Sequence, residues 1–119
     1  MANEITVQVT LSATKSGATV TGTCQLSENM AGGQFISNVQ IVGTSNEALT
    51  LGDVSTIGYV FCKNLDEVNY IEVSLDTAQA QLVAKLLPGE CCLFKPGTIT
   101  LYAKANTDPV NLQVVALEL

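Results

Sequence analysis

Short runs in which apolar and polar side chains alternate constrain this chain more than any other feature. In residues 4–11 every second residue is a large aliphatic one, namely Ile5, Val7, Val9 and Leu11. Because successive side chains of a β-strand point to opposite faces, this pattern predicts a strand with one buried face and one face in water. The same period of two recurs in residues 19–26, 35–42, 57–63, 68–76 and 98–104. The chain is therefore predicted to be built from strands.

Turn-forming residues separate these runs at intervals of about ten residues, the spacing typical of sandwiches. The tripeptide at residues 15–17, Lys-Ser-Gly, predicts a hairpin loop over residues 12–18, and residues 27–34 with Gly32-Gly33 predict a second loop. Residues 64–67, Asn-Leu-Asp-Glu, predict a tight turn that makes a hairpin of residues 57–63 and 68–76.

The last forty residues of the chain carry further signals for turns and strands. Pro88-Gly89 and Pro96-Gly97 each fit a type II turn, in which proline presets one torsion and glycine supplies the positive one. Residues 81–86 contain good helix formers but also alternate, and the surrounding strands favour a strand there. Residues 110–119 are apolar on both faces, which predicts a strand central in a sandwich or buried by another chain.

Together these patterns predict an all-β fold, an antiparallel β-sandwich or jelly-roll-like domain of eight to ten short strands. The 119 residues fit one domain, residues 1–119, and are enough to bury a core without disulfides. No basic and apolar leader precedes the first strand, so no signal peptide is predicted, and the four cysteines are expected to be reduced. No apolar run is long enough to predict a membrane span.

The charge balance excludes several classes of function. Five Lys stand against eleven Asp and Glu, and the chain has no Arg and no His. Nucleic-acid binding is not expected, because its affinity comes mainly from neutralised phosphates. Without His the usual general base near neutral pH and the commonest metal ligand are both missing. The sequence contains no nucleophile motif either, so the chain is predicted not to be an enzyme.

Three groups of residues have the residue types of a functional site, but each has a plainer interpretation. Cys91 and Cys92 are adjacent, so in a strand their sulfurs diverge, and zinc binding is not predicted. The acidic residues Asp66, Glu67, Glu72 and Asp76 lack the spacing of a calcium loop and are interpreted as a solvated turn. The tyrosines Tyr59, Tyr70 and Tyr102 are interpreted as core or rim residues in preference to a sugar-stacking platform. No catalytic, cofactor-binding or metal-binding residue is predicted.

Most of the chain is similar to a group of small proteins from tailed bacteriophage genomes. The similarity is carried by residues 47–76 (EALTLGDVSTIGYVFCKNLDEVNYIEVSLD), by residues 86–90 (LLPGE), and by residues 101–117 (LYAKANTDPVNLQVVAL). These are turn and core residues and not a chemical signature. The resemblance implies a virion structural protein, a capsid cement or decoration protein, and it carries no catalytic residues.

The resemblance also implies partners and a location. Such proteins bind the outer surface of the major capsid protein lattice and stabilise the head, commonly as homotrimers of β-rich subunits. The expected location is the capsid surface of the virion, after assembly in the host cytoplasm. The alternative is a β-sandwich binding module, for carbohydrate or a host surface, on a phage head or tail fibre.

Four residues are predicted to contribute to a subunit or capsid interface. Met30 lies in the glycine-rich loop, and Val115, Leu117 and Leu119 form one of the two apolar faces of the last strand. A lightly charged chain, with 13% charged residues, fits a protein that lies against other protein surfaces. We therefore expect this second apolar face to be covered by another chain.

Overall fold

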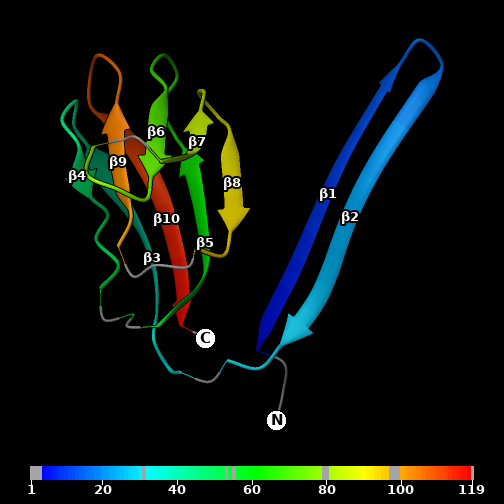
Figure 1. The fold of residues 1–119 in the computed structure, drawn as a ribbon, viewed down its shortest axis with the longest axis horizontal. Coiled ribbons are helices and arrows are strands. Elements are labelled where there is room, and N and C mark those ends of the chain that lie inside the picture. Colours follow the sequence, from blue (N-terminus) through cyan, green and yellow to red (C-terminus); the bar gives the residue numbers. More distant parts are fainter. Residues whose placement is uncertain are drawn as a thin grey trace. The chain divides into compact units, whose positions relative to one another are not determined.

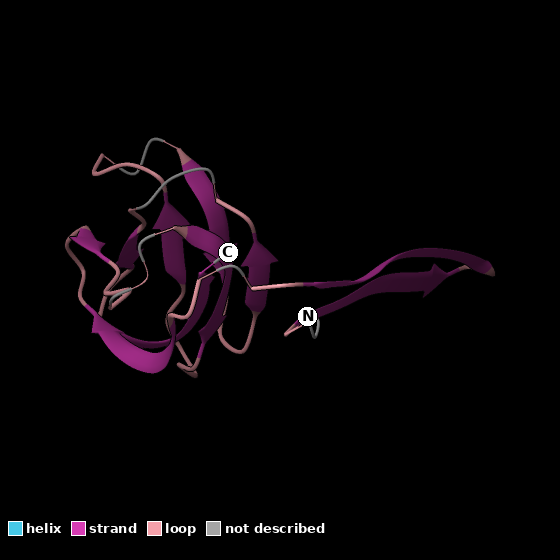
Figure 2. Ribbon diagram, turned by 90° about the horizontal axis from the view of Figure 1, so that it is seen from below, coloured by secondary structure: helices cyan, strands magenta, loops and turns pink. Residues whose placement is uncertain are grey.

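The computed structural model describes residues 4–30, 32–52, 54, 56–78, 81–96 and 100–118. This part of the chain contains ten strands, and Figure 2 shows no helix in it. Every pairing between these strands is antiparallel. The all-β antiparallel fold is therefore confirmed. Two compact units, Met1–Ala31 and Gly32–Leu119, make up the chain. The prediction of a single domain over residues 1–119 stays a prediction.

The first unit is one long hairpin of β1 (Ile5–Lys15) and β2 (Ala18–Glu28), labelled in Figure 1. The strands pair along their whole length, from Ile5 opposite Glu28 to Lys15 opposite Ala18. Only Ser16 and Gly17 form the turn, with φ of 54° and 81°. Two positive φ values match a type I′ turn, whose twist fits paired strands. The predicted loop over residues 12–18 was wrong, because this two-residue turn lets both strands continue to its edge.

Gly17 in this turn gives a first test of the hairpin. Replacing Gly17 by Ala places a Cβ at φ of 81°, in a position with no neighbouring atom within 4 Å. Only the backbone conformation is therefore strained, and we expect a loss of about 1–2 kcal/mol in hairpin stability. Amide hydrogen exchange should accelerate in β1 and β2 and stay unchanged in β5 and β10. Unchanged exchange in β1 and β2 would contradict the assigned turn.

The second unit is a sandwich of two four-stranded sheets. One sheet has the order β3 (Phe35–Val42), β10 (Val110–Glu118), β5 (Ile57–Asn64) and β8 (Cys91–Phe94). The other has the order β4 (Glu47–Ala48), β9 (Tyr102–Ala105), β6 (Ile71–Ser74) and β7 (Leu82–Leu86). The strand at Leu82–Leu86 confirms strand over helix for that segment.

The strand order is that of a jelly roll. The first strand of the sandwich pairs with the last, β3 with β10, then β4 with β9, β5 with β8 and β6 with β7. The chain thus follows one long hairpin that is rolled into two sheets. One further pair completes each sheet, β10–β5 in the first and β6–β9 in the second. The predicted hairpin of residues 57–76 was wrong, because β5 and β6 lie in different sheets and the turn between them is a crossover.

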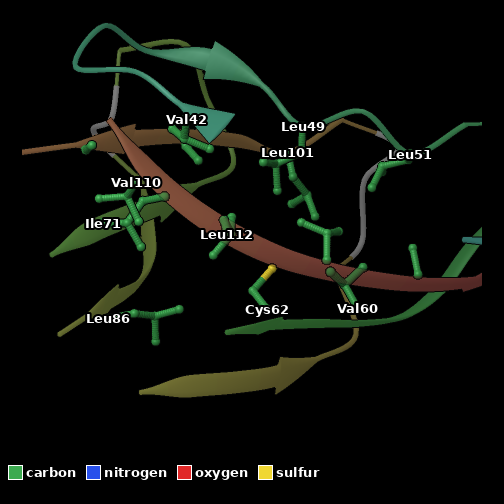
Figure 3. Close-up of a cluster of buried hydrophobic side chains, with 14 residues drawn as sticks. Val42, Leu49, Leu51, Val60, Cys62, Ile71, Leu86, Leu101, Val110 and Leu112 are labelled. Atoms are coloured by element: carbon green, nitrogen blue, oxygen red, sulfur yellow. The ribbon is translucent and has the colours of Figure 1, made fainter. Parts of the chain in front are cut away.

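The core lies between these two sheets and is aliphatic. Figure 3 shows side chains from both sheets converging on it, including Val60, Ile71, Leu101 and Leu112. These four side chains are fully buried. At the β7–β8 turn, Gly89 has φ of 82° and the Glu90 N–H donates to the Leu87 carbonyl at 2.9 Å, which confirms the type II turn at Pro88-Gly89. The predicted turn at Pro96-Gly97 lies outside the described residues.

Candidate interaction surfaces

The sheet β3-β10-β5-β8 has an outward side that is largely apolar. The pairing register places Ser37, Val115, Phe61 and Leu93 in one row across its four strands. We call the following residues the outer face: Phe35, Val39 and Ile41 of β3, Phe61 of β5, Leu93 of β8, and Val115 and Leu117 of β10. Exposure is greatest on the edge strand β3, where Phe35 is 65%, Val39 55% and Ile41 68% exposed. Such a contiguous apolar surface is typical of a contact with another protein.

The outward side of the opposite sheet is different in kind. There Glu72 lies in a row between Lys104 and Lys85, so charges of both signs cross the sheet. The Lys85 Nζ atom lies 4.2 Å from the centre of the Tyr70 ring. These polar side chains suit contact with water. The outward side of β3-β10-β5-β8 is therefore the more apolar of the two, although Gln113 and Lys63 also lie on it.

The four residues predicted to form an interface lie in different parts of the chain. Val115 and Leu117 are half-buried and lie at the centre of the outer face, because β10 has β3 on one side and β5 on the other. Met30 lies in the first unit, where its N–H donates to the Glu4 carboxylate at 2.9 Å. Leu119 lies outside the described residues. Their role in an interface stays a prediction.

The β1–β2 hairpin, which we call the arm, is strongly two-sided. One side carries the apolar pairs Val7–Leu26, Val9–Cys24, Leu11–Gly22 and Ala13–Val20. The other side carries only Thr, Ser and Gln from Thr6 to Thr14 and from Thr19 to Ser27. Every residue of 8–25 is exposed, including Leu11 at 76% and Val20 at 69%. A hollow of about 350 Å³ lies at mid-arm, lined by Gln8, Val9, Thr10, Thr23, Cys24 and Gln25.

The strand edges of the arm lack the protections that are usual in natural proteins. Lys15 is its only charged residue between Glu4 and Glu28. A two-stranded hairpin is marginally stable alone in water, and its outer strand edges offer unpaired backbone groups. Natural proteins protect such edges with charges, proline or a covering element. Residues 5–14 and 18–27 contain no charged residue and no proline, so these two protections are missing from both strands of the arm.

Of the acidic residues Asp66, Glu67, Glu72 and Asp76, Asp66 takes part in a turn, whereas Glu72 lies in β6. The Asp66 carboxylate accepts hydrogen bonds from the N–H groups of Asn69 at 2.6 Å and Val68 at 2.9 Å. These bonds lower the pKa of Asp66 below its usual value. The ionised form therefore stabilises the fold above the ordinary pKa, and this contribution is lost as the pH falls through the lowered pKa. Among the described residues, no three His, Cys, Asp or Glu side chains are grouped to hold a metal.

The three tyrosines do not form one platform. Tyr59 projects outward from β5, whereas Tyr102 projects from β9 of the opposite sheet. The Tyr70 ring lies against Lys85 of β7, and β7 also belongs to the opposite sheet. A sugar-stacking surface built from all three is therefore not present.

A pair of cysteines that are distant in sequence meets between β5 and β8, and sequence reasoning missed it. Cys62 lies directly opposite Cys92, while Cys91 is exposed on the other side of β8, as its adjacent position predicts. The hydrogen bond to Cys92 and burial raise the pKa of the Cys62 thiol far above its ordinary value. The same hydrogen bond lowers the pKa of Cys92. All four cysteines are free thiols in the structure.

This arrangement predicts an order of thiol reactivity. Only the thiolate attacks an alkylating reagent, so Cys62 should stay unmodified by iodoacetamide at pH 8 until the protein unfolds. Cys92, which is half-buried and has the lower pKa of the pair, should react before Cys62. Mass spectrometry of digests taken over time measures both rates. Labelling of Cys62 as fast as Cys92 in folded protein would contradict the pairing.

Comparisons with known proteins give no relative, since no family model, curated protein or solved structure matches the chain. The described residues contain no helix long and apolar enough to span a membrane.

Proposed function

We propose that this protein is a virion structural protein, a cement or decoration protein that binds the outer surface of a major capsid protein lattice. One observation carries the proposal: a jelly-roll sandwich leaves the outer face, with Val115 and Leu117 at its centre, apolar and only partly covered. Jelly rolls recur in viral capsid domains, although fold alone does not fix function. The resemblance to small phage proteins agrees with this assignment.

The remaining features fit a protein that works by contact. A lightly charged chain with an apolar sheet face and a charge-poor arm offers surfaces for protein partners and none for phosphate backbones. A homotrimer would repeat each contact around an axis, and several weak contacts to a lattice add up through multivalency. In this role the protein stabilises the head on the capsid surface, after assembly in the host cytoplasm, and catalyses no reaction.

Binding to heads that lack the protein tests the proposal. Heads are purified from the phage that encodes this chain after deletion of its gene, and purified protein is titrated onto them. We expect saturation at a fixed ratio to the major capsid protein, and heads that retain DNA at higher temperature. The variant Val68→Lys, at a loop residue that is 81% exposed, serves as a control and should bind equally well.

The opposite results are distinct. Folded protein that does not bind heads at any concentration would contradict the proposal. If the same protein binds host cells or glycans instead, the alternative of a carbohydrate or host-surface binding module replaces it.

A further inference from the structure

We propose that Cys62 and Cys92 form a site of reversible oxidation, at which hydrogen peroxide converts the two thiols into a disulfide between β5 and β8. The proposal rests on how the fold places two residues that are far apart in the sequence. Cys62 lies directly opposite Cys92 in the pairing of the two strands. Cys62 is fully buried, whereas Cys92 is half-buried. The chemistry requires no capsid, so the inference goes beyond the proposed function.

The strand pairing sets the distance between the backbones of the two cysteines. Two positions away from this pair in each strand, the Asn64 N–H donates to the Glu90 carbonyl at 2.9 Å. Hydrogen-bonded and non-hydrogen-bonded pairs alternate along an antiparallel ladder, so Cys62 and Cys92 also form a hydrogen-bonded pair, with Cα atoms about 5.5 Å apart. Natural disulfides join Cα atoms that are about 4.4–6.8 Å apart. The bond can therefore form without a change in strand register.

The two sulfur atoms already face each other on the core side of the sheet. Cys62 belongs to the buried hydrophobic cluster, where Figure 3 shows its sulfur, and Cys92 packs against that cluster. The Cys62 thiol donates a hydrogen bond to the Cys92 sulfur. The other two cysteines are exposed, Cys24 in the arm and Cys91 on the outward side of β8. The fold thus brings one pair of thiols together.

The two cysteines have different roles in the oxidation. β8 is an edge strand, and the half-buried Cys92 is the thiol of the pair that a small oxidant can reach. The hydrogen bond from Cys62 lowers the pKa of Cys92 and so favours its thiolate, the form that attacks. The Cys92 sulfur bonds to one peroxide oxygen and the O–O bond breaks. The departing hydroxide takes a proton to become water, which leaves a sulfenic acid on Cys92.

Cys62 completes the reaction. Its sulfur attacks the sulfur of the sulfenic acid, the S–S bond forms, and the S–O bond breaks. The departing hydroxide takes the Cys62 proton and becomes a second water. In total the two thiols give up two electrons and two protons to one peroxide, and two waters result. A dithiol such as dithiothreitol reverses the change by thiol–disulfide exchange.

The disulfide would tie an edge strand to an inner strand of its sheet. It would close a loop from residue 62 to residue 92, and this loop contains β6 and β7 of the opposite sheet. Closing such a loop restricts the unfolded chain, so the oxidised protein should unfold at a higher temperature. In the proposed role, the thiols would stay reduced during assembly in the cytoplasm and meet oxidants after release. That timing rests on the proposed function, whereas the disulfide does not.

Oxidation of a variant that keeps only these two cysteines tests the proposal. The variant is Cys24→Ser with Cys91→Ser, both at exposed positions, and it is treated with hydrogen peroxide after removal of reductant. We expect a loss of two hydrogen atoms, about 2 Da, at the mass of a single chain, and no thiol left for iodoacetamide in denaturant. The midpoint of thermal unfolding should rise by about 10 °C, and dithiothreitol should reverse both changes.

The matched control adds Cys92→Ser to the same variant and should show neither the mass loss nor the rise in midpoint. Three results in folded protein would overturn the proposal. One is a pair of thiols that stays free at every peroxide concentration, and another is a disulfide that links two chains. The third is oxidation of Cys92 to the sulfinic acid while Cys62 stays a thiol. No capsid enters this experiment, so its failure and the failure of the proposed function are separate results.

Discussion

Replacing Asn64 by Leu is expected to lower the free energy of unfolding by about 3–5 kcal/mol, since several buried polar groups lose their partners. Asn64, the last residue of β5, is fully buried. Its Nδ2 group donates to the carbonyls of Asn69 and Leu86, both at 2.9 Å, and its Oδ1 accepts the Asp66 N–H at 2.8 Å. Leu86 ends β7 in the opposite sheet, so this one side chain joins the two sheets.

Leucine has nearly the same shape but cannot make any of these bonds, so two carbonyls and one N–H are left without the partner that Asn64 gives them. Urea unfolding at one fixed protein concentration measures the loss, because assembly also contributes to apparent stability. The matched control is Asn111→Leu on the neighbouring strand β10, where the side chain is exposed and the expected change is small. Equal stability of Asn64→Leu and the unaltered protein would contradict the described network.

Replacing Leu112 by Ala is expected to cost about 3–4 kcal/mol, from lost burial and from the cavity left behind. Leu112 is fully buried in β10, one of the two inner strands of its sheet, and Figure 3 shows it in the middle of the core. Surrounding aliphatic side chains belong to both sheets and are fixed by strand pairing, so they can fill little of the cavity.

The control for this substitution is Leu82→Ala in β7, where the side chain is 49% exposed and the same chemical change should cost far less. Thermal unfolding of both variants at matched concentration gives the comparison. A Leu112→Ala variant that is no less stable than Leu82→Ala would mean that the core is not centred on β10.

The strands themselves could be predicted because period-two alternation depends only on neighbouring residues. β3 begins and ends where the alternation in residues 35–42 does, and the last strand has the two apolar faces that its sequence indicates. The outward position of Val115 and Leu117 follows from the same alternation. What alternation cannot give is which strand lies beside which.

The turn after Asn64 illustrates this limit. Asn, Asp and adjacent charged residues indicate a chain reversal, but a hairpin and a crossover between sheets use the same residues. Asn64 was interpreted as a turn residue, whereas it is buried and joins segments 22 residues apart in sequence. The Cys62–Cys92 pair also depends on long-range register. The sequence predicts a longer loop, and therefore shorter strands, in the β1–β2 hairpin. The reason is that Ser16 is not a residue type that signals a positive φ.

We propose that the arm and the outer face are surfaces for association with other protein chains. The most direct test is the mass of the purified protein in solution, measured by light scattering behind a sizing column over a range of concentrations. We predict a homotrimer, with three times the chain mass of 12.5 kDa. A monomer that remains at 12.5 kDa from micromolar to millimolar concentration, with Leu11 and Phe35 still accessible to solvent, would contradict the claim.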